Sequence, residues 1–378
     1  MAEEYGYDVH LLIPRVWESY WFQEKQVFKS QEEHSHNFHI HPMATTSVKN
    51  WGRYFFLSLD VKLRSIKPDL IYILHEESSW VHHQIYLYRK LWCSKAKIIF
   101  FSMNARGIRT ERFYHRLMWK DIKENTEAAL VHYPGCLESL RAGGYEKPVY
   151  MQTQIGVDED MFCPDEGKRK HIREQLGVKG KFVIGYAGRL IEDKGLDDLI
   201  SILPLEGVDW ALLLVGDGSM RQEIEDLQQN SPWGERIILT GSVSMDEVPS
   251  YMRAMDCFVL ASKTMPHWID TFPLVSVQAQ ACGVPVIGSD SGAIPWQLGE
   301  SALLFPEGDR ESFKARVRAY ALDEGLRLGY AEAGRLRSLE NFCTRRMTKN
   351  FHYVVQQVMR QEFAYHEIGE EHLQWKAY

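Results

Sequence analysis

Residues 268–295 read WIDTFPLVSVQAQACGVPVIGSDSGAIP and contain, in order, a polar loop, a helix, a strand and a second loop. Pro273 suits the first turn of that helix, because the N–H that proline lacks would have no partner there. Gly283 suits its end, where a left-handed residue often follows the last turn. The apolar run at 284–287 then reads as a buried strand. The stretch therefore predicts one helix-to-strand unit of an α/β fold.

The same alternation of helix and strand patterns continues through the second half of the chain. Short apolar runs alternate there with segments of helical spacing. The strands predicted in this half are 182–186, 210–215, 236–239, 257–260, 284–287 and 302–305. Because these runs are continuously apolar, both faces of their sheet should be covered, which is typical of a doubly wound parallel sheet.

The first half alternates less regularly, with predicted strands at 9–13, 38–42, 70–74, 97–101, 129–132 and 149–154. We expect a second Rossmann-like α/β domain at residues 1–156 and the more regular domain at 157–345. Residues 346–378 read as a long, polar-faced helix that packs back on the first domain.

Bulk composition sets further bounds. A chain of 378 residues with 45% apolar and 12% aromatic side chains can bury two cores. Its net charge of −7 disfavours a nucleic-acid-binding surface. No apolar run approaches the roughly 20 residues that cross a bilayer. Six scattered cysteines without metal-like spacing, and a start without signal-peptide features, lead us to expect a cytoplasmic location.

The segment GYAGRLIEDKG at 185–195 is the first candidate for binding chemistry. Small residues around Gly188 let a ligand approach the end of a strand, and two cations, Arg189 and Lys194, follow. Cations beside the free N–H groups of a helix start are suited to a diphosphate. The alternative interpretation is a solvated turn with two ordinary surface cations.

Two further turns follow predicted strands. VGDG places Gly216 and Gly218 at the carboxyl edge of the sheet, where ligands bind in open α/β folds. Arg221 occupies the third glycine position of a dinucleotide fingerprint, which disfavours such a cofactor. TGSVS, with Ser242 and Val243, would expose backbone donors to a base, or would be merely a turn.

The helix of the opening stretch carries two polar exceptions. Asp270 lies just before it and Gln278 about two turns further on. A carboxylate and an amide at this interval can reach two ends of one nucleotide sugar while the helix N-terminus faces the phosphates. The alternative is an ordinary buried helix.

Together these motifs resemble the retaining glycosyltransferases of family four, especially bacterial members that make exopolysaccharide. The resemblance covers GRLIEDKG at 188–195, LLLVGDG at 212–218, GSVS at 241–244, ACGVPVIGSDSGAIP at 281–295 and LFPEGD at 304–309. More loosely, 68–77, 101–104 and 156–162 resemble the corresponding strand ends and interdomain segment. The resemblance implies a GT-B fold, in which two Rossmann-like doubly wound domains face each other across a cleft.

The resemblance also implies a metal-independent hexosyltransferase without cofactor. UDP-glucose is the favoured donor, and the acceptor is a growing glycan or a lipid-linked saccharide. Arg189 and Lys194 would hold the diphosphate, Asp270 the sugar hydroxyls and Gln278 the ribose. The remaining donor-binding candidates are Gly188, Gly216, Gly218, Ser242, Val243, Thr271, Phe272, Pro273, Leu274 and Val275.

On the acceptor side, we expect Glu76, with Glu77 beside it, and Asn104 to contact the acceptor or the sugar. A carboxylate there would orient or deprotonate a hydroxyl. The alternative is that these are solvated residues after strands.

The chain also departs from the family. Family members usually carry glutamate at the positions of Asp270 and Gln278, so a nucleotide-sugar-binding protein without turnover is the second hypothesis. An epimerase on a similar scaffold is disfavoured by the motifs around Arg189. Residues 5–14 resemble the family's second strand, so we expect the first domain to lack the usual first one.

Three other signals remain open. Asp158-Glu159-Asp160 has the D-x-D form of metal-dependent transferases, but it lies in the interdomain segment and we assign it no metal. His34, His36, His39 and His41 suit zinc, or are exposed histidines without cysteine or carboxylate support. Residues 89–123 carry ten Lys or Arg against two acidic residues, interleaved with Trp92, Phe113, Tyr114, Leu117 and Trp119. This suits docking on an anionic membrane, or a solvated helix face over core aromatics.

Overall fold

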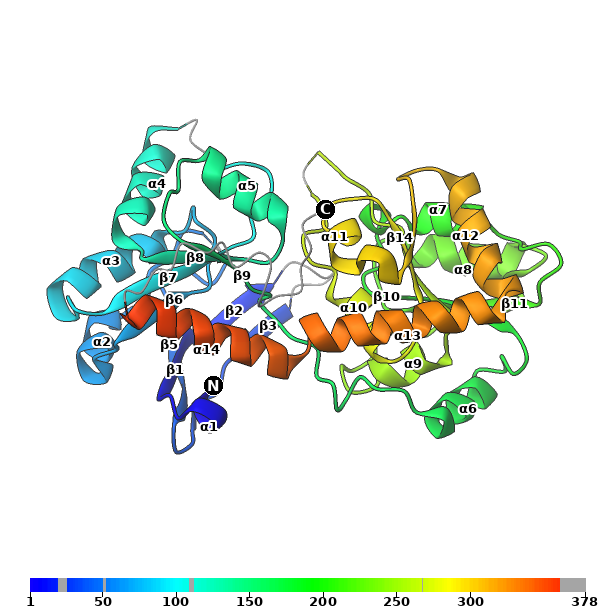
Figure 1. Ribbon diagram of the computed structural model, residues 1–378, viewed down its shortest axis with the longest axis horizontal. Coiled ribbons are helices and arrows are strands. Elements are labelled where there is room, and N and C mark those ends of the chain that lie inside the picture. Colours follow the sequence, from blue (N-terminus) through cyan, green and yellow to red (C-terminus); the bar gives the residue numbers. More distant parts are fainter. Residues whose placement is uncertain (20–25, 50–51, 109–111, 267, 361–378) are drawn as a thin grey trace. The chain divides into compact units, whose positions relative to one another are not determined.

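The computed structural model describes residues 1–19, 26–49, 52–108, 112–266 and 268–360 (Figure 1). The chain divides into two compact units, one of residues 1–154 with the segment from 348 onward and one of residues 155–347. The sequence predicts these divisions after residues 156 and 345. Each unit is an α/β structure.

The second unit is built on a six-stranded sheet with the strand order β12-β11-β10-β13-β14-β15. All its neighbouring strands are parallel. The strands are β10 (Phe182–Ala187), β11 (Trp210–Val215), β12 (Ile237–Leu239), β13 (Cys257–Leu260), β14 (Val286–Ser289) and β15 (Leu303–Phe305). The six predicted strands are confirmed, although β14 begins two residues late, after Pro285, which has no N–H for the ladder.

Helices cover both faces of this sheet. They are α6 (Glu166–Gln175), α7 (Leu196–Ser201), α8 (Arg221–Asn230), α9 (Val248–Ala254), α10 (Leu274–Ala281), α11 (Ile294–Leu298), α12 (Arg310–Leu322) and α13 (Glu324–Asn341), with short 3-10 helices at Glu192–Lys194, Gly234–Arg236 and Gly299–Ser301. Ile184 and Leu212 join the core with residues of α7, α8 and α12. Their neighbours Val183 and Leu213 point to the other face and are equally buried, as the continuous apolar runs predict.

The first unit contains a parallel sheet and a separate mixed sheet where the sequence predicts one Rossmann-like sheet. β6 (Leu70–Ile73), β7 (Lys97–Ser102), β8 (Ala128–Val131) and β9 (Val149–Met151) form one sheet, while β1 (Val9–Pro14) pairs with β5 (Phe38–Met43), and β4 (Glu33–His34) adds to β5 in antiparallel fashion. Side-chain packing joins the two sheets, because Met43, Leu63 and Val81 pack with Leu12 and Ile71.

An antiparallel ribbon, β2 (Val16–Ser19) with β3 (Gln26–Lys29), was not predicted. The helices of this unit are α1 (Ala2–Tyr5), α2 (Leu59–Ile66), α3 (Trp80–Trp92), α4 (Phe113–Asn125), α5 (Pro134–Ala142) and most of α14 (Thr344–Arg360).

Helix α14 returns to the first unit, as expected. Val354 and Val358 are buried with Ile99 and Leu130 of β7 and β8. The expected continuation of this helix beyond residue 360 lies outside the described residues. Within the described ranges, no helix combines the length and the apolar character that crossing a membrane would need.

Candidate functional site

The candidate donor site lies at the carboxyl ends of β10 and β13. The order of the strands reverses there, because β11 and β12 lie on one side of β10, whereas β13, β14 and β15 lie on the other. Ligands bind at this switch point in open α/β sheets. The structure thus brings the motifs around Arg189 and Asp270 to one edge of one sheet.

A hydrogen bond from a buried tyrosine fixes the backbone of Arg189. The Tyr186 hydroxyl on β10 donates to the Arg189 carbonyl over 2.8 Å. Gly188, between them, has φ +147°, and a Cβ there would lie 2.9 Å from the same hydroxyl oxygen. Because this conformation is unfavourable for other residues, Gly188 sets the direction in which the half-buried Arg189 leaves the sheet edge.

Lys194 and Asp270 form a buried ion pair. Lys194 Nζ lies 2.6 Å from Asp270 Oδ2, and the two side chains are 15% and 8% exposed. The Ser262 hydroxyl donates to the same carboxylate oxygen over 2.9 Å. Lys194 Nζ also lies 4.3 Å from the centre of the Trp268 ring. The sequence assigns these two residues to different parts of a donor and does not predict their contact.

The backbone holds both partners of this pair in place. Gly195, next to Lys194, has φ +67°, and a Cβ there would lie 1.9 Å from the Ala261 carbonyl oxygen at the end of β13. The Asp270 carbonyl accepts the Ala293 N–H over 2.9 Å. Fixed positions of this kind suit electrostatic catalysis, because the charges need not reorganise when the substrate reacts.

Gly216 and Gly218 join neighbouring turns. A Cβ on Gly216 would lie 1.9 Å from the Gly188 carbonyl oxygen, and one on Gly218 would lie 2.3 Å from that of Leu190. The Gly216 N–H donates to the Gly241 carbonyl over 2.9 Å. Close backbone packing therefore explains both glycines, and their predicted contact with a donor stays a prediction.

Helix α10 begins at Leu274, with Pro273 in the preceding position, and ends before Gly283, which has φ +75°. The predicted limits of this helix are confirmed. Thr271, Phe272, Leu274 and Val275 are half-buried around its first turn, where helical N–H groups have no partner within the helix.

Gln278, like Asp270, is a buried polar residue. In the turn after β12, Ser242 is exposed and Val243 is half-buried.

On the first unit, Glu77, rather than its neighbour Glu76, contacts the edge of the sheet. Its carboxylate accepts a hydrogen bond from the Ser102 hydroxyl at the end of β7, while Glu76 is exposed. Burial raises the pKa of Glu77. Asn104 closes its own turn, since its side chain donates to the Gly107 carbonyl and accepts from the Arg106 N–H, both over 3.0 Å.

Two buried residues of the first unit, His132 and Cys136, were not singled out from the sequence as site residues. Cys136 Sγ lies 3.7 Å from His132 Nε2, and burial lowers the pKa of His132 to about 4. His132 comes directly after β8, so its position at a strand end was the signal that could have identified it.

The D-x-D residues serve local structure. Asp158 accepts from the N–H groups of Asp160 and Met161, each over 3.0 Å, which closes a turn. Glu159 pairs with Arg345 over 3.0 Å. Among the described residues, neither group with metal-ligand geometry includes this segment.

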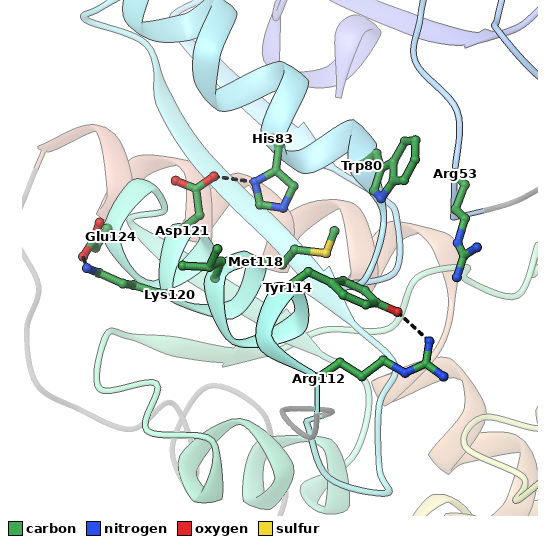
Figure 2. A pocket seen from close by; sticks show the side chains of 10 residues that line it. Arg53, Trp80, His83, Arg112, Tyr114, Met118, Lys120, Asp121 and Glu124 are labelled. Atoms are coloured by element: carbon green, nitrogen blue, oxygen red, sulfur yellow. Dashed lines mark hydrogen bonds and ion pairs between the residues drawn. The ribbon is translucent and has the colours of Figure 1, made fainter.

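A pocket of about 800 Å³ lies between α3 and α4 of the first unit (Figure 2). Trp80 and His83 of α3 face Tyr114, Met118 and Asp121 of α4. His83 Nδ1 lies 2.5 Å from Asp121 Oδ2, and His83 Nε2 is buried with no hydrogen-bond partner among the described residues. Each of the two helices therefore contributes both an aromatic and a polar side chain to the pocket.

Four of the five apolar residues noted in the basic segment are exposed. Trp92 is 46% exposed, Phe113 69%, Tyr114 40% and Leu117 51%, whereas Trp119 is 4% exposed and belongs to the core. The core interpretation of this segment therefore holds only for Trp119. Arg109 and Glu111 of the segment lie outside the described residues.

Comparison with known proteins agrees with this arrangement. Residues 168–337 match the family model for glycosyl transferases group 1. These residues form a group 1 glycosyl transferase domain. The resemblance to family-four glycosyltransferases is thereby confirmed on the half of the chain that carries its most specific motifs.

Curated relatives cover part of the chain. A GDP-mannose-dependent phosphatidylinositol monomannoside mannosyltransferase of Mycolicibacterium smegmatis is 28% identical over 50% of this chain and 51% of its own. The capsular polysaccharide glycosyltransferase CapM of Staphylococcus aureus is 30% identical over 50% and 49%. The chain thus spans about half the length of these relatives.

Solved structures extend the likeness to both units. Anabaena HepE in complex with UDP aligns with a TM-score of 0.64 at 17% identity, over 79% of this chain and 82% of that one. Sucrose-phosphate synthase from Thermosynechococcus elongatus aligns with a TM-score of 0.68 at 20% identity, over 94% and 90%. The expected GT-B fold is confirmed, and the cleft that the family implies stays a prediction.

Proposed function

We propose that this protein transfers a hexose from a nucleotide sugar to a growing glycan or a lipid-linked saccharide, with retention at the anomeric carbon. The observation that carries the proposal is the pair of Lys194 and Asp270 beside Arg189 at the switch point of the group 1 domain. A cation for a diphosphate and a carboxylate for sugar hydroxyls meet there at one position.

The chemistry follows from where charge develops. Breaking the bond between the anomeric carbon and the phosphate leaves negative charge on the departing diphosphate. Arg189, Lys194 and the first turn of α10 would stabilise that charge without a metal ion. Asp270 would accept hydrogen bonds from sugar hydroxyls, and Gln278 would bind the ribose.

UDP-glucose is the donor we favour. HepE is named in complex with UDP-glucose, whereas the mycobacterial relative is named as GDP-mannose-dependent. The test is binding and turnover of a panel of UDP-, GDP- and ADP-sugars.

Arg189→Ala tests the site within that panel. We expect it to keep the fold and to lower kcat by about 10²-fold or more, because it removes a cation from the leaving group. Arg236→Ala is the matched control, because Arg236 pairs with Asp209 at the amino end of the same sheet. An Arg189→Ala protein with unchanged kcat would refute the role.

The second candidate is a nucleotide-sugar-binding protein without turnover, favoured by the neutral Gln278 where relatives usually carry glutamate. Slow hydrolysis of a bound donor, without acceptor, separates the two. Binding without hydrolysis or transfer, even with acceptors supplied, would favour this second candidate.

For the acceptor side, we propose Glu77 together with the predicted Glu76 and Asn104. Burial raises the pKa of Glu77, so its carboxyl keeps a proton at a higher pH than an exposed glutamate does, which suits proton exchange with an acceptor hydroxyl.

We further propose that the exposed face of α4 docks on the inner, anionic surface of the cell membrane. Phe113, Arg116, Leu117 and Lys120 recur at helical spacing and are all exposed. Apolar side chains would enter the interface while the cations attract lipid phosphates. A lipid-linked acceptor would be met there.

Vesicle sedimentation tests the docking. The protein should pellet with vesicles rich in phosphatidylglycerol at low salt and be released at roughly 0.5 M salt, where screening is strong. Phe113→Ser with Leu117→Ser should abolish binding, whereas Leu328→Ser, which alters a residue 59% exposed on the second unit, should not. Equal pelleting of both variants would refute the docking face.

A further inference from the structure

Four histidines gather on one face of the β1-β5-β4 sheet, within the first unit. His10 of β1 lies opposite His39 of β5, and His34 of β4 also lies opposite His39. His41, two residues further along β5, points to the same side, because side chains alternate along a strand. His36 belongs to neither of the two groups with metal-ligand geometry found among the described residues.

Two carboxylates lie among these histidines in the folded first unit. Asp8 lies beside His10 and His39, and Glu32 lies beside His34 and His41. Asp8 Oδ2 is 3.2 Å from His10 Nε2, and Asp8 Oδ1 is 3.2 Å from His39 Nε2. In a tetrahedral zinc site with bonds of about 2.0–2.1 Å, neighbouring ligand atoms lie about 3.3 Å apart.

We propose that Asp8, His10 and His39 bind one divalent transition-metal ion of the zinc type. The three ligands come from β1, from the residue before it and from β5. Two imidazoles and one carboxylate form a ligand set that zinc accepts, with a fourth position left for water.

The two ligand histidines also have the outer partners that such sites require. His10 Nδ1 lies 2.9 Å from His41 Nε2, and His39 Nδ1 lies 3.0 Å from His34 Nδ1. When Nε2 binds a metal, the ring proton sits on Nδ1 and needs an acceptor, which fixes the tautomer and the ring orientation. His41 and His34 provide that acceptor for each ligand.

Lys62 sets a limit on affinity. Its ammonium lies 3.2 Å from His41 Nδ1. If His41 Nε2 accepts from His10, the proton of His41 lies on Nδ1 and faces this cation, which is unfavourable. The positive charge of Lys62 would also repel a divalent metal ion bound nearby and weaken its binding. Removing the charge of Lys62 should therefore tighten metal binding.

The site differs from the proposed donor site in both chemistry and residues. Its ligands all belong to the first unit, whereas the donor residues belong to the second. A metal ion at this position would tie β1 to β5. Its readouts are metal affinity and thermal stability, so the outcome does not depend on glycosyl transfer.

The experiment uses the untagged full chain, stripped with a chelator, because a polyhistidine tag would bind metal itself. Calorimetric titration with ZnCl₂ should show one ion per chain, and Co²⁺ should give the intense visible bands of a tetrahedral site. Asp8→Asn, His10→Ala and His39→Ala should each weaken zinc binding by about 100-fold or more. His171→Ala, at an exposed histidine of the second unit, should leave it unchanged.

Two further measurements keep the proposal falsifiable should a ligand variant fold poorly. Zinc should raise the melting temperature of the unaltered chain, and Lys62→Gln should bind zinc more tightly. No saturable zinc binding, or binding that survives in well-folded His10→Ala and His39→Ala proteins, would overturn the assignment. Weaker binding in Lys62→Gln, or dependence on Glu32 instead of Asp8, would also overturn it.

Discussion

At the scale of single residues, the contact between Lys194 and Asp270 changes what each can contribute. The positive charge of Lys194 is largely neutralised by the Asp270 carboxylate, because the two charged groups lie 2.6 Å apart. A diphosphate that reaches this cation therefore competes with Asp270, and a sugar hydroxyl that reaches Asp270 competes with Lys194. The pair couples the phosphate end of a donor to its sugar end.

Asp270→Asn separates these two effects. The amide keeps the shape and can still accept from Ser262, but it leaves the full charge of Lys194 for the diphosphate. We expect UDP alone to bind as tightly as before or more tightly, while kcat falls by about tenfold or more, because a charge-assisted hydrogen bond to the sugar is lost. Calorimetry with UDP and steady-state kinetics measure the two. Weaker UDP binding in this variant would contradict the coupling.

Gln278→Glu restores the residue type that the family usually carries. If Gln278 binds the ribose, a carboxylate there would form a stronger, charge-assisted bond, and donor affinity should rise by about tenfold. Gln280→Glu is the matched control, because Gln280 lies on the same helix, is fully buried and donates to the Ser301 hydroxyl. This control should lower stability without improving affinity. Unchanged donor affinity in Gln278→Glu would refute the proposal that Gln278 binds the ribose of the donor.

The residues of the candidate site were predictable where the sequence marks a strand end. Arg189, Lys194 and Asp270 all follow apolar runs, and carboxyl ends of parallel strands share one edge. Their pairing was not predictable, since residues 194 and 270 meet only through the order of β10 and β13. The same reason hid Asp8 from the histidine motif.

At the scale of elements, glycine packing holds the turns of the donor domain together. Gly216→Ala would drive a Cβ to within 1.9 Å of the Gly188 carbonyl oxygen at φ +140°. We expect a loss of about 3 kcal/mol or more in the free energy of unfolding, from strain and from displacement of a neighbouring backbone. Urea titration measures it.

Gly207→Ala is the control for that prediction. Gly207 has φ +76°, but a Cβ added there would have nothing within 4 Å. The free energy of unfolding of this variant should fall by roughly 1–2 kcal/mol, which is the cost of a left-handed backbone conformation for an L-residue. Equal losses for the two variants would show that contact between the turns contributes nothing.

Element prediction succeeded for the main strands of both units, including the partly buried β1 and β5, and failed for the β2-β3 ribbon. The continuous apolar strands of the second unit were all recognised, because both faces are covered. The β2-β3 ribbon was missed, since Val27 and Phe28 are about half exposed and strand pairing there depends on register more than on burial. The split of the first sheet was hidden for a related reason, as side-chain packing and not strand pattern decides it.

At the scale of the whole molecule, the two units differ in which titratable groups have shifted pKa values and in what shifts them. Burial lowers the pKa of His75 to about 4, of His82 to about 3 and of His132 to about 4, all in the first unit. In the second unit, the shifted carboxyls of Asp165, Glu206, Glu247 and Asp309 have lowered pKa values through hydrogen bonds. Those carboxyls lose their contribution only below about pH 4.5.

The first unit should therefore weaken first as pH falls. The pKa of a histidine in the unfolded chain is near 6.5. Below that pH the unfolded chain binds protons on these histidines, whereas the folded unit does not, so the free energy of unfolding decreases. Each buried histidine contributes up to about 1.4 kcal/mol per pH unit until its folded pKa is reached. Glu77, with a raised pKa, opposes this trend but is a single group.

His82→Gln tests this expectation at one residue. His82 is fully buried, with Nδ1 2.8 Å from the Tyr86 hydroxyl and Nε2 3.2 Å from the His75 carbonyl oxygen. Glutamine can keep a hydrogen bond there but takes up no proton. The difference in unfolding free energy between pH 7.0 and 5.5 should shrink by about 1.4 kcal/mol. His171→Gln, at an exposed position, should leave the difference unchanged, and an unaltered pH dependence in His82→Gln would mean that another group drives the acid sensitivity.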